Sequence, residues 1–473
     1  MRYSSAAGRW LLAATVLGSG MAAIDSTVVG IALPSIGREL HVQLAALQWV
    51  VSGYMLTLAA LLLPAGALGD QFGRKRVFSV GVLFFTVTSA ACAASPGAPV
   101  LISMRLLQGV GAALLTPGSL ALIQASLDPQ DRAKAIGAWS GLGGVATAAG
   151  PLLGGYLLTV ASWRWIFLIN VPVGAAVLAI TARHVPESKD QDAPRQIDAT
   201  GAVLAVAALF GVTYGLIEGP TRGYADVLVV VSLAGAVAAA VAFVIVERRS
   251  QAPMMPIEVL TVRQFNVTNL VTFIVYAALG GALLLVPVEL QVTDRYSPFA
   301  SGASLLPLTA IMLALSARSG RLSARIGPRL QMSVGPLGAG AGLLLFERAT
   351  TDASYLTGVL PAVLVLGLGL SCTVAPLTAT AMGALADRHT GLASAVNNDV
   401  ARLGSLIAVA SLPALCGISG AAYLRPLAMA HGFRTAMWLT AAMCAAGGAI
   451  AAGGIRNPAA ALPGLGRDGR WVK

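Results

Sequence analysis

The stretch Gly66-Ala-Leu-Gly69-Asp70-Gln-Phe-Gly73-Arg74-Lys75-Arg76 lies between two apolar runs that are each long enough to cross a bilayer. Because glycine has no Cβ, Gly66 and Gly69 are expected to let two helices approach closely, and Gly73 to permit a sharp reversal. Asp70 can accept hydrogen bonds at a helix end. The three basic residues that close the stretch favour the cytoplasmic side of a membrane. The stretch therefore predicts a tight cytoplasmic turn between two membrane helices.

A second, eroded copy of this turn follows 254 positions later as Gly320-Arg-Leu-Ser-Ala324-Arg325-Ile-Gly327-Pro-Arg329. The spacing of Gly, Leu, Gly and a basic residue is kept, whereas Ala324 stands at the position of Asp70. An internal repeat of this period indicates two related membrane bundles and not a solenoid of short units.

The composition agrees with a membrane protein. Of 473 residues, 56% are hydrophobic and 11% are charged, and the mean hydropathy is +0.78. Soluble globular domains carry about 25% charged residues. Apolar segments of about 20 residues recur along the chain, which is the helical way to span lipid and excludes a β-barrel. The sequence predicts an all-α integral membrane protein.

Fourteen spans are expected, arranged as six, two and six. An amino-terminal bundle covers 1–185, a cytoplasmic linker with two extra helices covers 186–264, a carboxyl-terminal bundle covers 265–455, and a basic tail covers 456–473. The polar segment Pro186–Asp198 is the linker. The spans lie near 10–32, 46–67, 77–95, 99–122, 134–159, 164–183, 199–218, 225–246, 266–289, 300–318, 331–347, 355–383, 391–416 and 434–454.

The net charge of +11 follows topology, which argues against nucleic acid as the partner. If the amino terminus is cytoplasmic, 22 Lys and Arg residues lie on the cytoplasmic side of the membrane and seven on the outer side. This distribution is expected because basic segments that flank a span resist translocation. An even number of spans returns the carboxyl terminus to the cytoplasm. We expect a multi-pass protein of a bacterial inner membrane, in contact with lipid, whose first span is not cleaved. Nothing in the sequence requires more than a monomer.

The four Cys and four His residues are scattered without paired spacing. They predict no disulfide, no metal site and no cofactor. The glycines of the fifth span also precede no Lys-Ser/Thr pair and follow no strand, so a phosphate loop is not expected. The sequence identifies no catalytic residue.

Ionisable residues inside apolar spans are costly and point to function. Asp25 lies in the first span, where it is either a protonatable group or a structural carboxylate. Arg105 lies in the fourth span with Gln108 one turn on, and Gly109 and Gly111 thin the helix for a neighbour. No acid is near Arg105 in sequence. Its partner is therefore expected from another helix, with Asp25 the nearest by depth, or from backbone and glutamine oxygens.

The fifth span carries Gly150-Pro151-Leu-Leu-Gly154-Gly155, which predicts a pliable helix that packs at short distance. In the second bundle, Asn397, Asp399 and Arg402 open the thirteenth span. Asp399 and Arg402 are three residues apart, and an intrahelical ion pair is the favoured interpretation, with a cavity or coupling role as the alternative. Glu289, near an outer helix end, is a minor candidate for a proton site.

Several stretches together resemble the major facilitator superfamily, specifically its fourteen-helix drug:proton antiporter branch. They are Gly66–Arg76, Arg105-Leu-Leu-Gln108-Gly109, Gly150–Gly155, Ile24-Asp25-Ser-Thr27-Val-Val-Gly30-Ile-Ala32-Leu33-Pro34, and Trp163-Arg-Trp-Ile-Phe-Leu-Ile-Asn170-Val-Pro172. The resemblance implies two six-helix bundles with pseudo-twofold symmetry that rock about a central cavity. It also implies proton coupling through Asp25 and Arg105, and a cytoplasmic latch that includes Asp70 and Arg74.

The sequence departs from the family pattern at three places. Gly30 stands where the first-helix motif usually has Asn, which removes an amide that could line the cavity or bond Asp25. Ala324 makes any latch asymmetric, and Ala401-Arg402 replaces the Arg-Gln common in relatives.

The leading hypothesis is a proton-coupled exporter of amphipathic small molecules such as drugs, antibiotics or toxic metabolites. A uniporter, an importer or a carrier of lipid-like metabolites would use the same scaffold. A membrane-embedded enzyme or a sensor is the remaining alternative, which the missing His/Cys/Asp cluster disfavours.

Overall fold

The structure is a computed structural model, which describes residues 1–189, 198–250, 259, 261–349, 354–385 and 390–457. The regular structure in these ranges is helical throughout, without strands. The first bundle contains α1 (Ala6–Leu40), α2 (Leu44–Phe72), α3 (Arg74–Ala93), α4 (Ala98–Ser126), α5 (Pro129–Val160), α6 (Trp165–Leu168) and α7 (Asn170–His184). The inserted pair is α8 (Ala199–Arg222) and α9 (Val227–Arg249). The second bundle contains α10 (Arg263–Val292), α11 (Pro298–Ser304), α12 (Leu306–Ile326), α13 (Pro328–Leu345), η2 (Phe346–Arg348), α14 (Tyr355–Gly358), α15 (Leu360–Gly383), α16 (Thr390–Leu415), η4 (Ala422–Leu424) and α17 (Pro426–Gly454).

Each expected span falls on one of these helices, or on a helix interrupted by a single residue. Twelve helical segments in the described ranges are long and apolar enough to cross a membrane. The other two expected spans fall on α13, which has 18 residues, and on α16, whose first half carries Asn397, Asp399 and Arg402. Because short length and polar residues reduce the apolar character of these helices, the count of fourteen spans stays a prediction. The tail from residue 458 and most of the polar linker lie outside the described residues.

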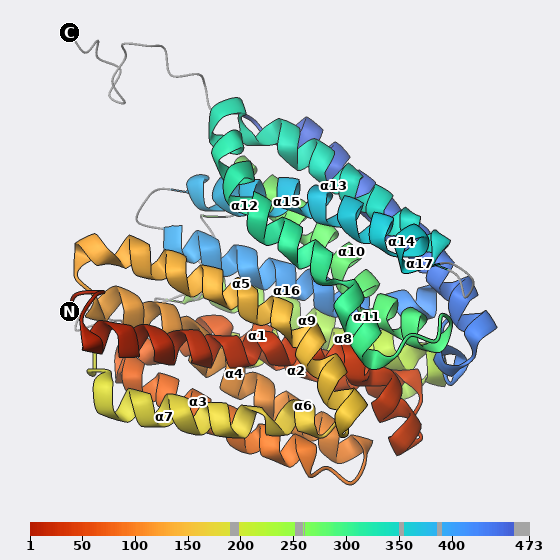
Figure 1. The fold of residues 1–473 in the computed structure, drawn as a ribbon, viewed down its shortest axis with the longest axis horizontal. Coiled ribbons are helices and arrows are strands. Elements are labelled where there is room, and N and C mark those ends of the chain that lie inside the picture. The colour runs from red at the N-terminus through yellow and green to blue at the C-terminus, as the bar shows by residue number, and fades with distance from the viewer. Residues whose placement is uncertain (190–197, 251–258, 260, 350–353, 386–389, 458–473) are drawn as a thin grey trace.

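The two bundles lie side by side, with the inserted pair against both of them (Figure 1). Helix α8 packs on α9, on α2 of the first bundle and on α16 of the second. Trp49 Nε1 donates a 3.1 Å hydrogen bond to Glu218, which fastens α8 to α2. The inserted pair therefore covers part of the seam between the bundles.

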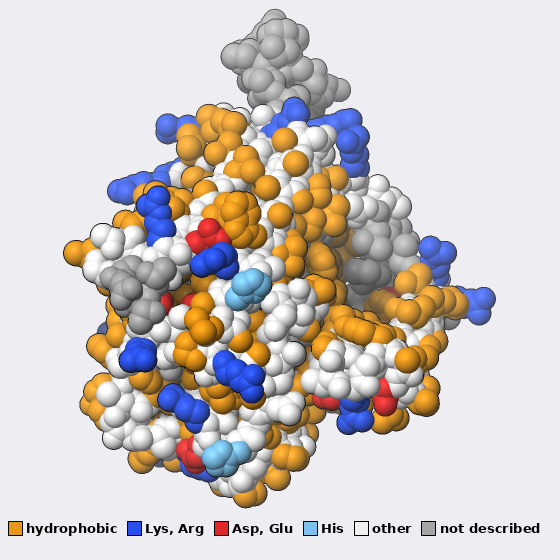
Figure 2. All heavy atoms as spheres, turned by 90° about the vertical axis from the view of Figure 1, so that its right-hand side faces the viewer, with side chains coloured by type: hydrophobic (Ala, Val, Ile, Leu, Met, Phe, Trp, Pro, Cys, Tyr) orange, Lys and Arg blue, Asp and Glu red, His pale blue; other side chains and the backbone are white. Residues whose placement is uncertain are grey.

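Side-chain hydrogen bonds between the bundles gather at one end of the molecule, which we call the joined end. Gln48 Nε2 donates to the Val409 carbonyl over 2.8 Å, and the Tyr423 hydroxyl donates to the Val42 carbonyl over 2.8 Å. Gln291 Nε2 donates to the Ile31 carbonyl over 3.0 Å. One hydrophobic cluster crosses both bundles here, whereas a second cluster belongs to the first bundle alone. Figure 2 faces the joined end, where charged side chains are scattered among hydrophobic ones.

Candidate functional site

A buried ion pair occupies the middle of the first bundle. Asp25 of α1 is 0% exposed and Arg105 of α4 is 1% exposed, and a carboxylate oxygen of Asp25 pairs with Arg105 Nη1. Arg105 Nη1 also donates to Gln108 Oε1 over 2.7 Å, and Arg105 Nε donates to the Val50 carbonyl over 3.0 Å. The expected partners of Arg105 are thus confirmed: Asp25, a glutamine oxygen and a backbone oxygen. The guanidinium has counter-charge and acceptors, which a buried cation requires.

Three neutral polar side chains, Gln108, Ser89 and Asn170, extend the hydrogen-bond network around the ion pair. Gln108 Nε2 donates to Asp25 Oδ1 over 3.0 Å and to Ser89 Oγ of α3 over 3.1 Å. Asn170, the first residue of α7, donates from Nδ2 to Ser89 Oγ over 3.0 Å and to Asp25 Oδ1 over 3.5 Å. Asp25 therefore receives its amide donors from Gln108 and Asn170, and position 30, where the sequence has Gly, supplies none. Ser89 and Asn170 had no assigned role in the sequence analysis.

Two glycines of α4 allow this helix to pack closely against α2 and α3. A Cβ on Gly109 would lie 2.4 Å from the Tyr54 carbonyl oxygen of α2, and one on Gly111 would lie 2.7 Å from the Phe85 nitrogen of α3. Real Cβ atoms do not approach so closely, so the expected thinning of the fourth span is confirmed. This close packing brings the Arg105 side chain within reach of the α2 backbone.

Tyr54 separates the ion pair from a cavity. Its ring lies with its centroid 4.3 Å from Arg105 Cζ, and its hydroxyl donates to the Ala22 carbonyl over 3.3 Å. The cavity on its other side measures about 330 Å³, within the range of small-molecule sites. Four helices of the first bundle and α16 of the second line it: Ser19, Ala22, Ala23, Ser26, Tyr54, Leu58, Thr116, Trp139, Ser140, Gly143, Thr147 and Arg402.

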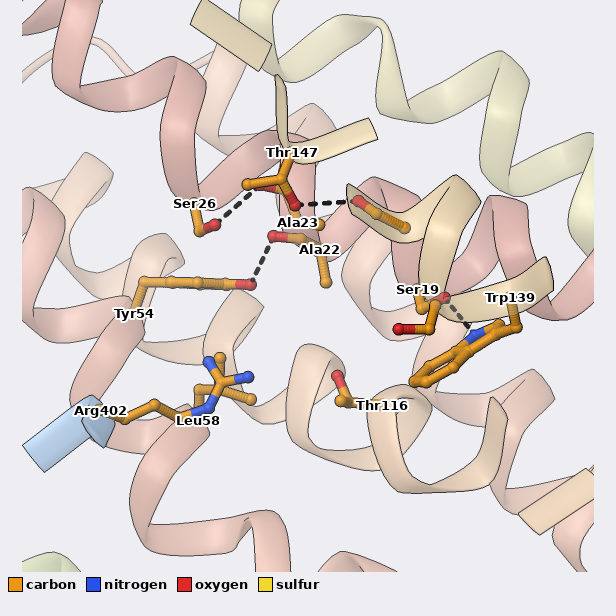
Figure 3. A pocket seen from close by; sticks show the side chains of 12 residues that line it. Ser19, Ala22, Ala23, Ser26, Tyr54, Leu58, Thr116, Trp139, Thr147 and Arg402 are labelled. Carbon is orange, nitrogen blue, oxygen red and sulfur yellow. Dashed lines mark hydrogen bonds between the residues drawn. The ribbon is translucent and has the colours of Figure 1, made fainter. Parts of the chain in front are cut away.

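The cavity wall combines aromatic, hydroxyl and basic groups (Figure 3). Trp139 of α5 is held by a 2.8 Å hydrogen bond from its Nε1 to Ser19 Oγ of α1. Arg402 extends from α16 toward Tyr54 and Leu58. In the part of the chain that the structure describes, it is the one charged residue of the cavity wall. Sequence reasoning missed Trp139 as a lining residue, although a tryptophan amid the glycines of the fifth span is a signal that could have been used.

The glycine and proline stretch of α5 packs against two other helices. A Cβ on Gly150 would lie 2.0 Å from Thr27 Oγ1, and one on Gly154 would lie 2.3 Å from Val28 Cγ2, both of α1. On another side, a Cβ on Gly155 would lie 2.6 Å from the Pro298 carbonyl oxygen of α11. Similarly, a Cβ on Gly302 of α11 would lie 2.2 Å from the Pro151 carbonyl oxygen. The expected short-distance packing is confirmed, and it includes a contact between the bundles.

The turn between α2 and α3 has the expected reversal at Gly73, whose φ is +108°. Arg74 closes an ion pair on Asp70, with Nη2 2.7 Å from Oδ1. The expectation for Gly66 and Gly69 is wrong. A Cβ on Gly66 would meet Pro117 at an ordinary 3.8 Å, and one on Gly69 would meet nothing within 4 Å. No helix of the described residues therefore packs closely on either glycine.

The polar residues of the second bundle are arranged differently from their expected pairing. Asp399 and Arg402 form no ion pair within the described residues, and Asp399 Oδ1 is buried without a hydrogen-bond partner. The expected intrahelical pair is wrong because Arg402 points into the cavity. Asn397 instead joins α16 to α10, donating to Asn269 Oδ1 over 3.0 Å and to Thr272 Oγ1 over 2.8 Å. Glu289 is 3% exposed and accepts a 3.0 Å hydrogen bond from Thr293, far along the chain from Asp25 and Arg105.

Comparison with known sequences identifies the family. The profile of the Major Facilitator Superfamily matches residues 15–409. The chain is 36% identical to the tetracenomycin C resistance and export protein of Streptomyces glaucescens, over 85% of this chain and 75% of that protein. It is also 36% identical to the methylenomycin A resistance protein of Bacillus subtilis, over 89% and 90% of the two chains. A puromycin resistance protein of Streptomyces alboniger is 36% identical over 88% and 83%.

Solved transporter structures share the fold. A bacterial homologue of the human lysosomal transporter Spinster, in an inward-facing and unoccupied conformation, superposes with a TM-score of 0.65 at 17% identity, over 95% and 97% of the two chains. A D-xylose-proton symporter superposes with a TM-score of 0.67 at 13% identity, over 95% and 98%. Together with the family match and the relatives above, the fold points to a multi-span membrane transporter and not to an enzyme. The chain belongs to the major facilitator superfamily.

Proposed function

We propose that this protein exports amphipathic small molecules, such as drugs or antibiotics, in exchange for protons. The observation that carries the proposal is the buried Asp25–Arg105 pair beside a cavity lined by both bundles. Three relatives are resistance or export proteins, which supports the substrate class. The protein works as a monomer in the bacterial inner membrane, with both termini in the cytoplasm.

Protonation of Asp25 is the proposed coupling step. A neutral Asp25 no longer attracts Arg105, which keeps the Gln108 and Val50 oxygens and the Tyr54 ring as partners. Helix α1 carries both Asp25 and the cavity residues Ser19, Ala22 and Ser26. A change of attraction between α1 and α4 therefore changes the wall that holds the substrate. Substrate and proton favour different states of this wall, which is the condition for exchange.

Alternating access uses the two ends of the molecule. With a cytoplasmic amino terminus, the joined end is extracellular and the cavity is loaded from the cytoplasm. The contacts of Gly155 with Pro298 and of Pro151 with Gly302 hold that end closed. Closure of the opposite end would engage the Asp70–Arg74 turn as a latch. Rocking of the bundles then releases the substrate outside.

The test measures dissipation of a pH gradient in proteoliposomes that contain the full chain. A panel of cationic, neutral and anionic amphipathic compounds is added to wild type and to Asp25→Asn. Substrate-evoked proton movement is expected in wild type and absent in Asp25→Asn. The matched control is Asp128→Asn, because Asp128 is a paired but surface-exposed acid that should leave transport unchanged. Uphill transport by Asp25→Asn would refute the coupling role. Transport of labelled substrate without proton movement in wild type would assign a uniporter.

A further inference from the structure

We infer that the cavity selects anionic, ring-bearing small molecules, whose negative group binds the Arg402 guanidinium. This inference rests on the proposed export function and specifies the substrate class of the same cavity. Its starting point is the charge of the wall. Among the described residues, Arg402 is the one charged group that lines the cavity, and none of the carboxylates does so. A cationic ligand would be repelled by Arg402 and would find no ionised acceptor on the wall.

Neither Asp25 nor Asp399 forms an ion pair with Arg402 among the described residues. Asp25 is 0% exposed, is paired with Arg105 and is not among the residues that line the cavity. Asp399, three residues before Arg402, makes no ion pair with it among the described residues. A guanidinium held among membrane helices without a direct counter-ion is costly. A bound anion would remove that cost, and the planar guanidinium suits bidentate binding of a carboxylate.

The remaining wall defines the rest of the ligand. Trp139, which is only partly buried, offers an aromatic surface for an apolar ring. The hydroxyls of Ser26, Thr116 and Thr147 each donate to a backbone carbonyl of their own helix, over 2.8, 2.7 and 3.0 Å. Because the proton of each hydroxyl is already donated to a carbonyl, its oxygen can only accept a hydrogen bond from a ligand in the cavity. The expected ligand therefore carries an anionic group at one end, a flat ring, and hydroxyl donors that reach these oxygens.

The experiment compares three probes with one ring system and different charges. They are 1-naphthylacetate, 2-(1-naphthyl)ethanol and 2-(1-naphthyl)ethylamine, titrated at pH 7 into the purified full chain in nanodiscs by calorimetry. We expect the anion to bind about tenfold more tightly than the amine, as a partly screened charge pair predicts. Arg402→Gln should remove this preference, and Arg402→Lys should keep most of it. Arg425→Gln is the matched control, since Arg425 is exposed on the N-terminal side of α17 and does not line the cavity.

The neutral alcohol reports on folding. Its affinity should be the same in wild type and Arg402→Gln, whereas Trp139→Ala should weaken all three probes. The inference is overturned if the amine binds as tightly as the anion in wild type, if the preference survives Arg402→Gln, or if none of the probes binds. The assay uses no gradient and no transport. Anion-selective binding together with silent proteoliposomes would therefore count against the export mechanism alone.

Discussion

The first bundle pairs its acids with basic groups at three depths, whereas the second bundle places neutral or unpaired groups at comparable positions. Asp70 pairs with Arg74 at the turn, Asp25 with Arg105 in the middle, and Glu39 with Arg164 at the joined end. Between described residues of 265–457 there is no ion pair. The middle of the second bundle uses the Asn397 amide instead. Charge compensation is thus a property of the first bundle, which leaves Arg402 of the second available to the cavity.

The repeated turns show the same contrast at one structural position. Gly73 and Gly327 both have positive φ, +108° and +83°, and each faces a residue that follows the last helix of its own bundle. In the first bundle Glu187 accepts from the Lys75 and Arg76 amides over 3.0 and 3.2 Å. In the second, Asn457 accepts from the Arg329 amide over 3.0 Å. Both halves therefore use the same helix-capping geometry, but the capping side chain is charged only in the first bundle.

The largest predicted effect tests the difference between the two middle networks. Asp25→Ala leaves Arg105 buried without counter-charge and should lower the free energy of unfolding by about 3–5 kcal/mol. Asn397→Ala removes two neutral hydrogen bonds and should lower it by about 1–2 kcal/mol. The measurement is unfolding by sodium dodecyl sulfate in mixed micelles. Equal losses in the two variants would contradict the proposed division of charge between the bundles.

A smaller effect is expected at the two caps. Glu187→Ala should destabilise the start of α3, and Asn457→Ala the start of α13, each by about 1 kcal/mol, because each removes an acceptor for free amides. Hydrogen exchange of the amides at 75–76 and at 329 measures both. High salt should weaken the contribution of Glu187 and leave that of Asn457 unchanged. A salt effect at Asn457 would show that the neutral cap is not what distinguishes the second turn.

The ends of the first helices of each bundle provide a pH test. Glu39, at the end of α1, is paired with Arg164, whereas Asp294, just after α10, has a buried Oδ1 without a hydrogen-bond partner among the described residues. Burial raises the pKa of Asp294 from 3.8 to about 6. A raised acid pKa means that the folded state holds the proton longer, so this contribution is complete below pH 3.8 and is lost as pH rises through about 6.

Relative to Asp294→Asn, wild type should therefore lose stability between those pH values. The loss should be at most about 1 kcal/mol, because Asp294 is partly exposed and solvent screens its charge. Thermal unfolding of both proteins at a series of pH values measures it. Parallel pH profiles for wild type and Asp294→Asn would mean that the unpaired acid has no such role.

The smallest effect concerns the Asp70–Arg74 pair, whose side chains are 41% and 20% exposed. Asp70→Asn should cost about 0.3–0.5 kcal/mol at low salt and nothing measurable at high salt. Ala324→Asp should not create a matching pair, since position 328, which corresponds to Arg74, is proline. Unfolding of the three proteins at two salt concentrations tests both statements. A gain of stability in Ala324→Asp would indicate that the second turn can form an equivalent latch.

Much of the fold could be read from the chain. Apolar runs separated by basic or Gly/Pro-rich breaks located the long helices, because lipid demands a helical stretch of that length. The repeat around Gly73 and Gly327 predicted two reversals, and both glycines have the positive φ that such a reversal uses. Asp25 was the expected partner of Arg105, because buried charges need counter-charges and few candidates exist at that depth.

Other features were decided only by tertiary structure. The rotation of each helix determines which residues face the cavity, and sequence spacing does not fix that rotation when most residues are apolar. For this reason the place of Trp139 in the cavity wall emerged only from the structure. The hydrogen bonds of Ser89 and Asn170 around Asp25 likewise depend on tertiary packing. The three-residue spacing of Asp399 and Arg402 places them on one helical face, but the neighbouring helices direct Arg402 into the cavity instead. Sequence determined where the chain crosses the membrane and which charges need partners, and packing between helices determined which partners they meet.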